Sequence, residues 1–229
     1  TPDTDFSYGA RVQYMSVTAR DRFDPSAPSG SFGVAATPLD MSETNHALHL
    51  GLEHRLNQTV AVFARAAHAF RTPNVDERVV TGPAWDCSSY PSPCLPIPQD
   101  FALKTQTSDD VEGGVRITAG AVKMQTSVYY MRLTNEIHFN PVDLYNYNLD
   151  PTRRYGSETR ASFRVSDTFR LRGSLAYTRA QFRDGPFAGN DVPLVSRWSG
   201  SAGFSWNVWQ NYLVLDADAR FWSSRRMDN

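Results

Sequence analysis

Lysine, cysteine and long apolar runs are all scarce in this chain of 229 residues. The only lysines are Lys104 and Lys123, so arginine supplies 21 of the 23 basic side chains, and the formal net charge is -1. A nearly neutral chain gives no reason to expect a nucleic-acid partner. No stretch approaches the roughly 18 consecutive apolar residues of a transmembrane helix. Taken alone, this composition is typical of an ordinary soluble protein.

Helical periodicity is also nearly absent, and polar and apolar residues alternate with period two instead. Within 168–182, for example, Leu171, Leu175 and Tyr177 share one face and polar side chains occupy the other. The stretch 122–139 is the least regular, because its apolar positions change parity midway. Nine such stretches are predicted to be strands: 8–21, 44–56, 59–71, 103–118, 122–139, 153–166, 168–182, 194–206 and 211–222.

These predicted strands are long, and their connections are sorted by length. Strands of soluble proteins are typically about 5–6 residues, whereas roughly 11 residues of tilted strand cross the ~25 Å apolar band of a membrane. Long and short connections alternate strictly, which places tight turns at one end of an antiparallel meander and extended loops at the other. Outer-membrane barrels are built in this way. The sequence favours an all-β, antiparallel up-and-down transmembrane β-barrel.

A soluble all-β protein with a solvated charged face is the alternative, since alternation alone fits both architectures. The charges of both signs on the polar faces favour a large barrel, whose lumen can hold water or a plug. Nine strands cannot close a bacterial barrel, which uses an even number. The first residues, 1–5, also lack the basic start and apolar run of a signal peptide. We therefore expect residues 1–229 to be one partial barrel domain, an internal piece of a longer protein.

Five segments between about residues 55 and 222 resemble, in the correct order, the barrel of TonB-dependent outer-membrane receptors. Residues 70–77 (FRTPNVDE) resemble the "FRxPN" segment of that family. The other four are Leu103-Lys104 with 112–114 (EGG), 129–137 (YYMRLTNEI), 148–158 (NLDPTRRYGSE), and 176–195, which begins AYTRAQF and ends GNDVPLV.

The resemblance implies a 22-stranded barrel in the outer membrane of a Gram-negative bacterium, plugged by an N-terminal globular domain that is expected outside this chain. Such receptors import scarce ligands, and the ferric-siderophore class is the most populous. Haem and cobalamin receptors of the same family are alternatives. The implied partners are the ligand, outer-membrane lipid, and TonB, which contacts the plug and supplies energy.

Candidate ligand-binding residues lie in the predicted outer loops and at the end of one strand. They are Arg71, Trp85, Tyr90, Tyr145 and Tyr147. Aromatic side chains on stiff loops can stack on a ligand, and loop packing or anchoring at the membrane interface is the alternative. Arg71 and the pair Arg153/Arg154 would attract an anionic ferric chelate, or would form salt bridges within the barrel wall.

Cys87 and Cys94 lie within the segment CSSYPSPC of the longest predicted loop. In an oxidising compartment this pair predicts a local disulfide worth about 2 kcal/mol. A metal or redox pair is the alternative, although the spacing is not C-x-x-C. The five histidines form no convincing metal site, and no hydrolase or nucleotide-binding motif is present. No catalytic residue, metal or cofactor is therefore expected, and a barrel-borne hydrolase is the enzymatic alternative.

Overall fold

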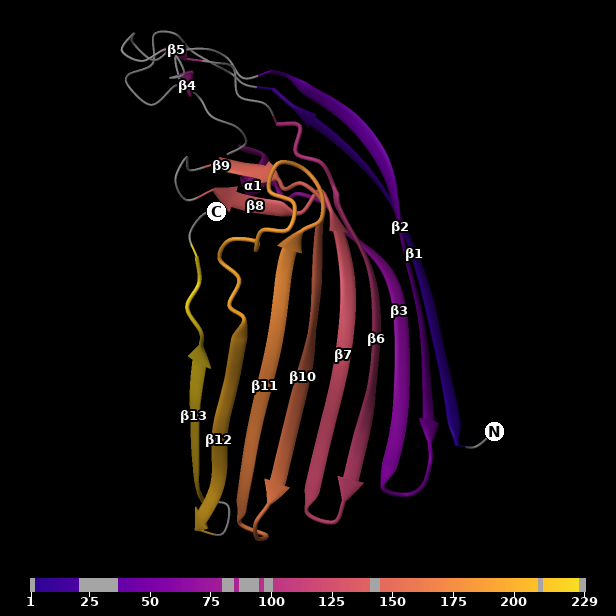
Figure 1. Cartoon of the computed structure of the whole chain (residues 1–229), viewed down its shortest axis with the longest axis vertical. Coiled ribbons are helices and arrows are strands. Elements are labelled where there is room, and N and C mark those ends of the chain that lie inside the picture. The colour runs from indigo at the N-terminus through magenta and orange to yellow at the C-terminus, as the bar shows by residue number, and fades with distance from the viewer. Residues whose placement is uncertain are drawn as a thin grey trace.

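The computed structural model describes residues 3–20, 37–79, 85–86, 95–96, 101–140, 145–209 and 212–226. Nine antiparallel strands form one curved sheet in which each strand pairs with the next along the meander (Figure 1). These strands are β1 (Thr4–Ala19), β2 (Leu39–Arg55), β3 (Val60–Arg71), β6 (Gln106–Ala119), β7 (Val122–Thr134), β10 (Thr152–Arg164), β11 (Phe169–Phe182), β12 (Trp198–Trp209) and β13 (Leu213–Trp222).

Three smaller features occupy the longer connections. A short helix, α1 (Val75–Val79), follows β3, and two-residue strands β4 (Trp85–Asp86) and β5 (Leu95–Pro96) pair with each other before β6. The hairpin of β8 (Ile137–Asn140) and β9 (Tyr145–Asn148) lies between β7 and β10. Within the described ranges, no helix has the length and apolar character needed to cross a membrane.

All nine predicted strands are present, and the up-and-down order is confirmed. The single predicted strand 122–139 is wrong beyond Thr134, where β7 ends, because Asn135 has a left-handed φ of 55°. Asparagine tolerates that conformation better than most residues. The chain therefore leaves the sheet there and starts the β8–β9 hairpin. The predicted strand 194–206 begins late for a similar reason, since Leu194 has a φ of 62°.

Tight turns gather at one end of the sheet, the lower end in Figure 1, and the longer connections start from the other end. Gly120 has a φ of 55° in the two-residue turn between β6 and β7, a conformation that glycine adopts without steric cost. In the turn before β3, Asn57 Oδ1 accepts hydrogen bonds from the backbone N–H groups of Thr59 (2.8 Å) and Val60 (2.9 Å). The alternation of loop lengths predicted from the sequence is thus confirmed.

The cross-strand register sorts side chains onto two faces of the sheet. Residues aligned with Leu171 and Leu175 form what we call the apolar face, and residues aligned with Arg170 and Arg172 form the charged face. Leu175 remains 46% exposed on the apolar face. Among the described elements, no second sheet of comparable size exists to cover either face. These exposed apolar rows do not fit a soluble sandwich, in which such rows are buried against a partner sheet.

One close approach on the charged face requires glycine. Tyr129 on β7 and Thr178 on β11 are both register partners of Gly156 on β10. The Tyr129 hydroxyl crosses over Gly156 to lie 2.8 Å from Thr178 Oγ1. A Cβ atom at Gly156 would overlap the carbonyl oxygen of Tyr177 and approach the Tyr129 hydroxyl to 3.0 Å. The missing side chain thus allows a three-strand contact.

We predict that Gly156→Ala destabilises the folded sheet by about 1–3 kcal/mol, the usual cost of overpacking. The measurement is the free energy of unfolding in urea for the protein folded into detergent micelles. Gly113→Ala is the matched control, because an added Cβ there meets its nearest heavy atom, the carbonyl oxygen of Phe63, at 3.7 Å. Equal effects of the two substitutions would contradict the prediction.

Candidate functional site

The end of the sheet opposite the tight turns holds the predicted ligand-binding residues that the structure describes. Helix α1 and the β8–β9 hairpin both lie at this end, close to each other (Figure 1). Asn146 on β9 donates a hydrogen bond from Nδ2 to the carbonyl oxygen of Glu77 on α1 (3.1 Å). Two connections that are about 70 residues apart in sequence thus form one unit, which we call the outer platform (α1 and β8–β9).

A reciprocal capping box starts α1. The backbone N–H of Glu77 donates to Asn74 Oδ1 (2.8 Å), and the backbone N–H of Asn74 donates to Glu77 Oε2 (2.9 Å). Such a pair satisfies two of the helix-start N–H groups that have no partner within the helix. The other carboxylate oxygen of Glu77 accepts a hydrogen bond from the Arg71 guanidinium. The FRTPNVDE segment therefore folds back on itself, with the last residue of β3 holding the first turn of α1.

Arg78 anchors α1 to the chain that enters β6. Its side chain is buried, and Nη1 donates to the carbonyl oxygens of Phe101 (3.0 Å) and Leu103 (2.9 Å). Burial lowers the pKa of the Arg78 guanidinium from its ordinary value, while Glu43 and Glu77 oppose this shift.

Asn148, the last residue of β9, joins three segments through its side chain. Its Oδ1 accepts from the backbone N–H of Lys104 (2.8 Å), and its Nδ2 donates to the carbonyl oxygens of Lys104 (3.0 Å) and Asn135 (2.8 Å). These bonds hold the hairpin against the chain leading into β6 and against the bend after β7. The position of the hairpin is therefore fixed at both of its ends.

A buried carboxylate fixes the start of β10. Thr152 is fully buried, and its hydroxyl donates to Glu136 Oε2 (2.8 Å). The Arg154 guanidinium pairs with the other oxygen of Glu136. Arg154 thus forms a salt bridge at the top of the wall, as one of the two alternatives for Arg153/Arg154 predicted.

The two predicted tyrosines lie together on β9, with ring centroids 5.7 Å apart. Tyr147 also meets the His138 ring edge-on at 6.0 Å and packs against a small apolar cluster. This cluster consists of Leu149, Ala180, Phe182 and Val192. Burial lowers the pKa of His138, and Arg154 lowers it further, while Glu136 acts in the opposite direction. Tyr147 thus packs against the wall and gives Tyr145 a firm base.

The charged face below the platform carries paired ions of both signs. Arg65 lies 3.0 Å from Asp110 and 3.4 Å from Glu112, and Arg172 lies 2.6 Å from Asp218. A hollow of about 460 Å³ opens on this face. Charged and polar side chains line most of it, including Arg65, Asp110, Glu112, Arg154, Glu158 and Arg160. The face therefore suits contact with water or with a polar body rather than with hydrocarbon.

Some of the remaining predicted site residues lie outside the residues that the structure describes. Trp85 lies on β4 without a described side chain, and Tyr90, Cys87 and Cys94 lie outside the described residues. Asp86, which precedes Cys87, and Leu95, which follows Cys94, are register partners. The disulfide between the two cysteines stays a prediction. In the described part of the chain, no group of three or more His, Cys, Asp or Glu side chains could hold a metal ion.

Comparison with known protein families decides the class. The family model described as "TonB dependent receptor-like, beta-barrel" matches residues 1–229. The chain belongs to the TonB-dependent receptor family. Members of this family reside in the outer membrane of Gram-negative bacteria. The apolar face of the sheet therefore meets lipid, and the charged face lines the lumen.

Solved structures of TonB-dependent receptors share the fold at low sequence identity. The copper transporter OprC superposes with a TM-score of 0.67 at 18% identity, over 90% of this chain and 31% of that one. The ferric citrate transporter FecA gives 0.63 at 16%, covering 97% and 30%. The ferric yersiniabactin uptake receptor FyuA from Yersinia pestis gives 0.60 at 16%, covering 94% and 30%. This chain thus spans under a third of each of these receptors, and no curated protein sequence matches it.

The capping box generates a local stability prediction. Asn74→Ala removes the acceptor for the Glu77 N–H and is expected to destabilise α1 by about 1 kcal/mol, which is roughly a fivefold increase in opening. Hydrogen exchange of the amides in α1, measured on the receptor in micelles, reports this opening. Val75→Ala is the control, because that side chain is 76% exposed. Unchanged exchange in Asn74→Ala would refute the role of the cap.

His138 makes the outer platform sensitive to acid. Its pKa is lowered in the folded hairpin, so the unfolded hairpin binds the proton more tightly. Stability of the hairpin is therefore complete above the ordinary histidine pKa of 6.5 and falls as the pH drops below it. Protection of the β8–β9 amides, corrected for intrinsic exchange, is expected to decrease between pH 7.5 and 5.5. In His138→Phe, which keeps an aromatic ring against Tyr147, this decrease should disappear.

Proposed function

We propose that this chain forms part of the wall of an importer that takes up a ferric siderophore across the outer membrane. The observation that carries the proposal is the arrangement of the outer platform above an ion-paired lumen face in a member of this family. A route lined by paired charges holds water, and the platform presents aromatic and cationic groups at its outer end. Energy would come from TonB through the plug, which lies outside this chain.

Arg71, Tyr145 and Tyr147 are the described residues proposed to contact the ligand. Arg71 is about half exposed although it pairs with Glu77, so part of its guanidinium remains available to an anionic chelate. Tyr145 lies next to Tyr147. Tyr147 packs against the apolar cluster that contains Phe182, and this packing limits the motion of Tyr147. A preorganised aromatic surface lowers the entropic cost of binding. We extend the proposal to Trp85 and Tyr90 in the connection between β3 and β6, where Cys87 and Cys94 would form the predicted disulfide.

Uptake by cells tests the proposal. The complete receptor is expressed in a strain without other iron receptors, and radiolabelled iron is supplied as ferric catecholate, ferric hydroxamate or ferric citrate. We expect uptake of at least one complex, abolished when TonB is deleted. Uptake of haemin, cyanocobalamin or Cu²⁺ in place of all three complexes would overturn the siderophore assignment while leaving the family intact.

The ligand contacts have their own test. Tyr145→Ala is expected to weaken binding of the transported complex about tenfold, equivalent to about 1.4 kcal/mol. Binding is measured by titration of the purified receptor. Tyr212→Ala is the matched control, because Tyr212 lies at the tight turn before β13, at the other end of the wall, and is 82% exposed. Equal affinities of the Tyr145 variant and the wild type would remove Tyr145 from the site.

A further inference from the structure

Two arginines face each other across neighbouring strands on the apolar face. Arg132 on β7 and Arg153 on β10 are register partners, and their strand neighbours Tyr130 and Tyr155 are register partners as well. Both pairs have the parity of Val128 and Ser157, which lie on the apolar face through their alignment with Tyr177 and Leu175. The four side chains thus form a two-by-two tile, with a pair of cations beside a pair of aromatic rings.

Neither arginine has an acidic partner within ion-pair distance among the described residues. The Arg132 guanidinium lies over the Tyr130 ring, 5.7 Å from its centroid, and its side chain is exposed. Arg153 makes one long hydrogen bond to Gln181 (3.4 Å), and its Nε is buried without a partner. Like charges directly opposite each other in a sheet are destabilising. Within the described residues, neither guanidinium of this pair therefore has a carboxylate as its ion-pair partner.

The tile lies near the outer edge of the apolar band, next to the headgroups of the outer leaflet. Val122 starts β7 at a tight turn, and Arg132 follows ten residues later on the same strand. At ~3.3 Å per residue and a tilt of ~45°, this separation is roughly 23 Å of height, close to the ~25 Å apolar band of such barrels. The tyrosines and the arginines thus lie near the outer edge of the apolar band, within reach of the headgroups.

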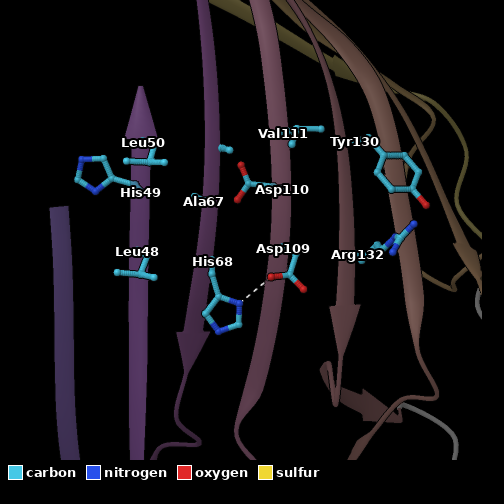
Figure 2. A pocket seen from close by; sticks show the side chains of 11 residues that line it. Leu48, His49, Leu50, Ala67, His68, Asp109, Asp110, Val111, Tyr130 and Arg132 are labelled. Atoms are coloured by element: carbon cyan, nitrogen blue, oxygen red, sulfur yellow. Dashed lines mark hydrogen bonds and ion pairs between the residues drawn. The ribbon is translucent and has the colours of Figure 1, made fainter. Parts of the chain in front are cut away.

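A groove beside the tile is shaped for a hydrocarbon chain. Figure 2 shows this groove, of about 500 Å³, running across β2, β3, β6 and β7. Ala66 lies in register between Leu50 and Val111, so a short side chain leaves a depression between longer ones. Leu48, Leu50 and Val111 supply its apolar surface, and Arg132 with Tyr130 borders one side. The groove therefore joins an apolar floor to the unpaired cations.

Asp109 lies beside this arrangement, and its carboxylate also contacts a histidine. It is the register partner of Arg132, yet its Oδ1 lies 2.7 Å from His68 Nδ1, as the dashed line in Figure 2 marks. His68 in turn stacks on His46 with ring centroids 5.0 Å apart. The carboxylate is thus drawn toward β3, away from Arg153 on β10.

We infer that Arg132 and Arg153 bind a phosphate of a phosphorylated lipid in the outer leaflet, one of whose acyl chains occupies the groove. Two guanidinium groups match the charge and the oxygen geometry of a phosphate. The tyrosine rings below them suit the boundary between headgroup and hydrocarbon. This site lies on the outside of the barrel wall and does not depend on which ligand the receptor imports.

Lipid retention tests the inference. The complete receptor is purified in detergent, incubated with lipid A, dephosphorylated lipid A or inorganic phosphate, and washed, and the bound lipid is measured by mass spectrometry. We expect the wild type to retain lipid A at least tenfold better than its dephosphorylated form. The double variant Arg132→Gln with Arg153→Gln should lose this preference. Ala66→Leu, which fills the groove, should reduce retention of both lipids.

Arg164→Gln is the matched control, since Arg164 lies on β10 with Arg153 but on the charged face, next to a tight turn. It should retain lipid A as the wild type does. A second readout separates binding from folding: without lipid, the double variant should unfold at the same temperature as the wild type or higher, because a like-charge contact is removed. Undiminished retention by the double variant, equal loss in the control, or equally tight binding of inorganic phosphate would each overturn the inference.

Discussion

Every feature of this chain depends on the need to satisfy backbone hydrogen bonds within a membrane. Hydrocarbon offers no partner for an N–H or C=O group, so strands must bond to their neighbours over the whole apolar band. The sequential pairing of nine long strands meets this requirement for the interior of the sheet. Because side chains alternate along each strand, the same pairing also separates lipid from lumen residue by residue. The apolar face and the charged face therefore both follow from the pairing of the strands.

Arginine matches this architecture better than lysine does. On the charged face, Arg65 lies between the carboxylates of Asp110 and Glu112, and Arg172 lies between those of Asp216 and Asp218. A planar group with five donors serves several carboxylates at fixed geometry, whereas an ammonium is a point charge. The same property lets Arg78 bridge two carbonyl oxygens at the base of α1. The scarcity of lysine noted in the sequence thus has a structural reason.

Periodicity predicted the strands well because it reports a local property, the alternation between two solvents. It failed at Asn135, where one left-handed residue ends β7 and redirects the chain. Helix α1 was not predicted, although Asn74 and Glu77 have the capping-box spacing that signals a helix start. The outer platform could not be predicted, since Asn148 binds Lys104 across 44 residues and no local pattern reports such a contact. Residues of the predicted site that lie outside the description stay predictions.

Arg153 and Arg154 show how much the register decides. They are adjacent in sequence, and the sequence offered the same two alternatives for both. In the sheet, consecutive residues face opposite ways, so Arg154 pairs with Glu136 on the charged face while Arg153 stands beside Arg132 on the apolar face. Arg154, which faces the lumen, finds a carboxylate on the same chain. A cation facing lipid must find its anion in the membrane, and only near the headgroups is one available. The position of Arg153 along β10 and its positive charge therefore both indicate a contact with an anionic headgroup.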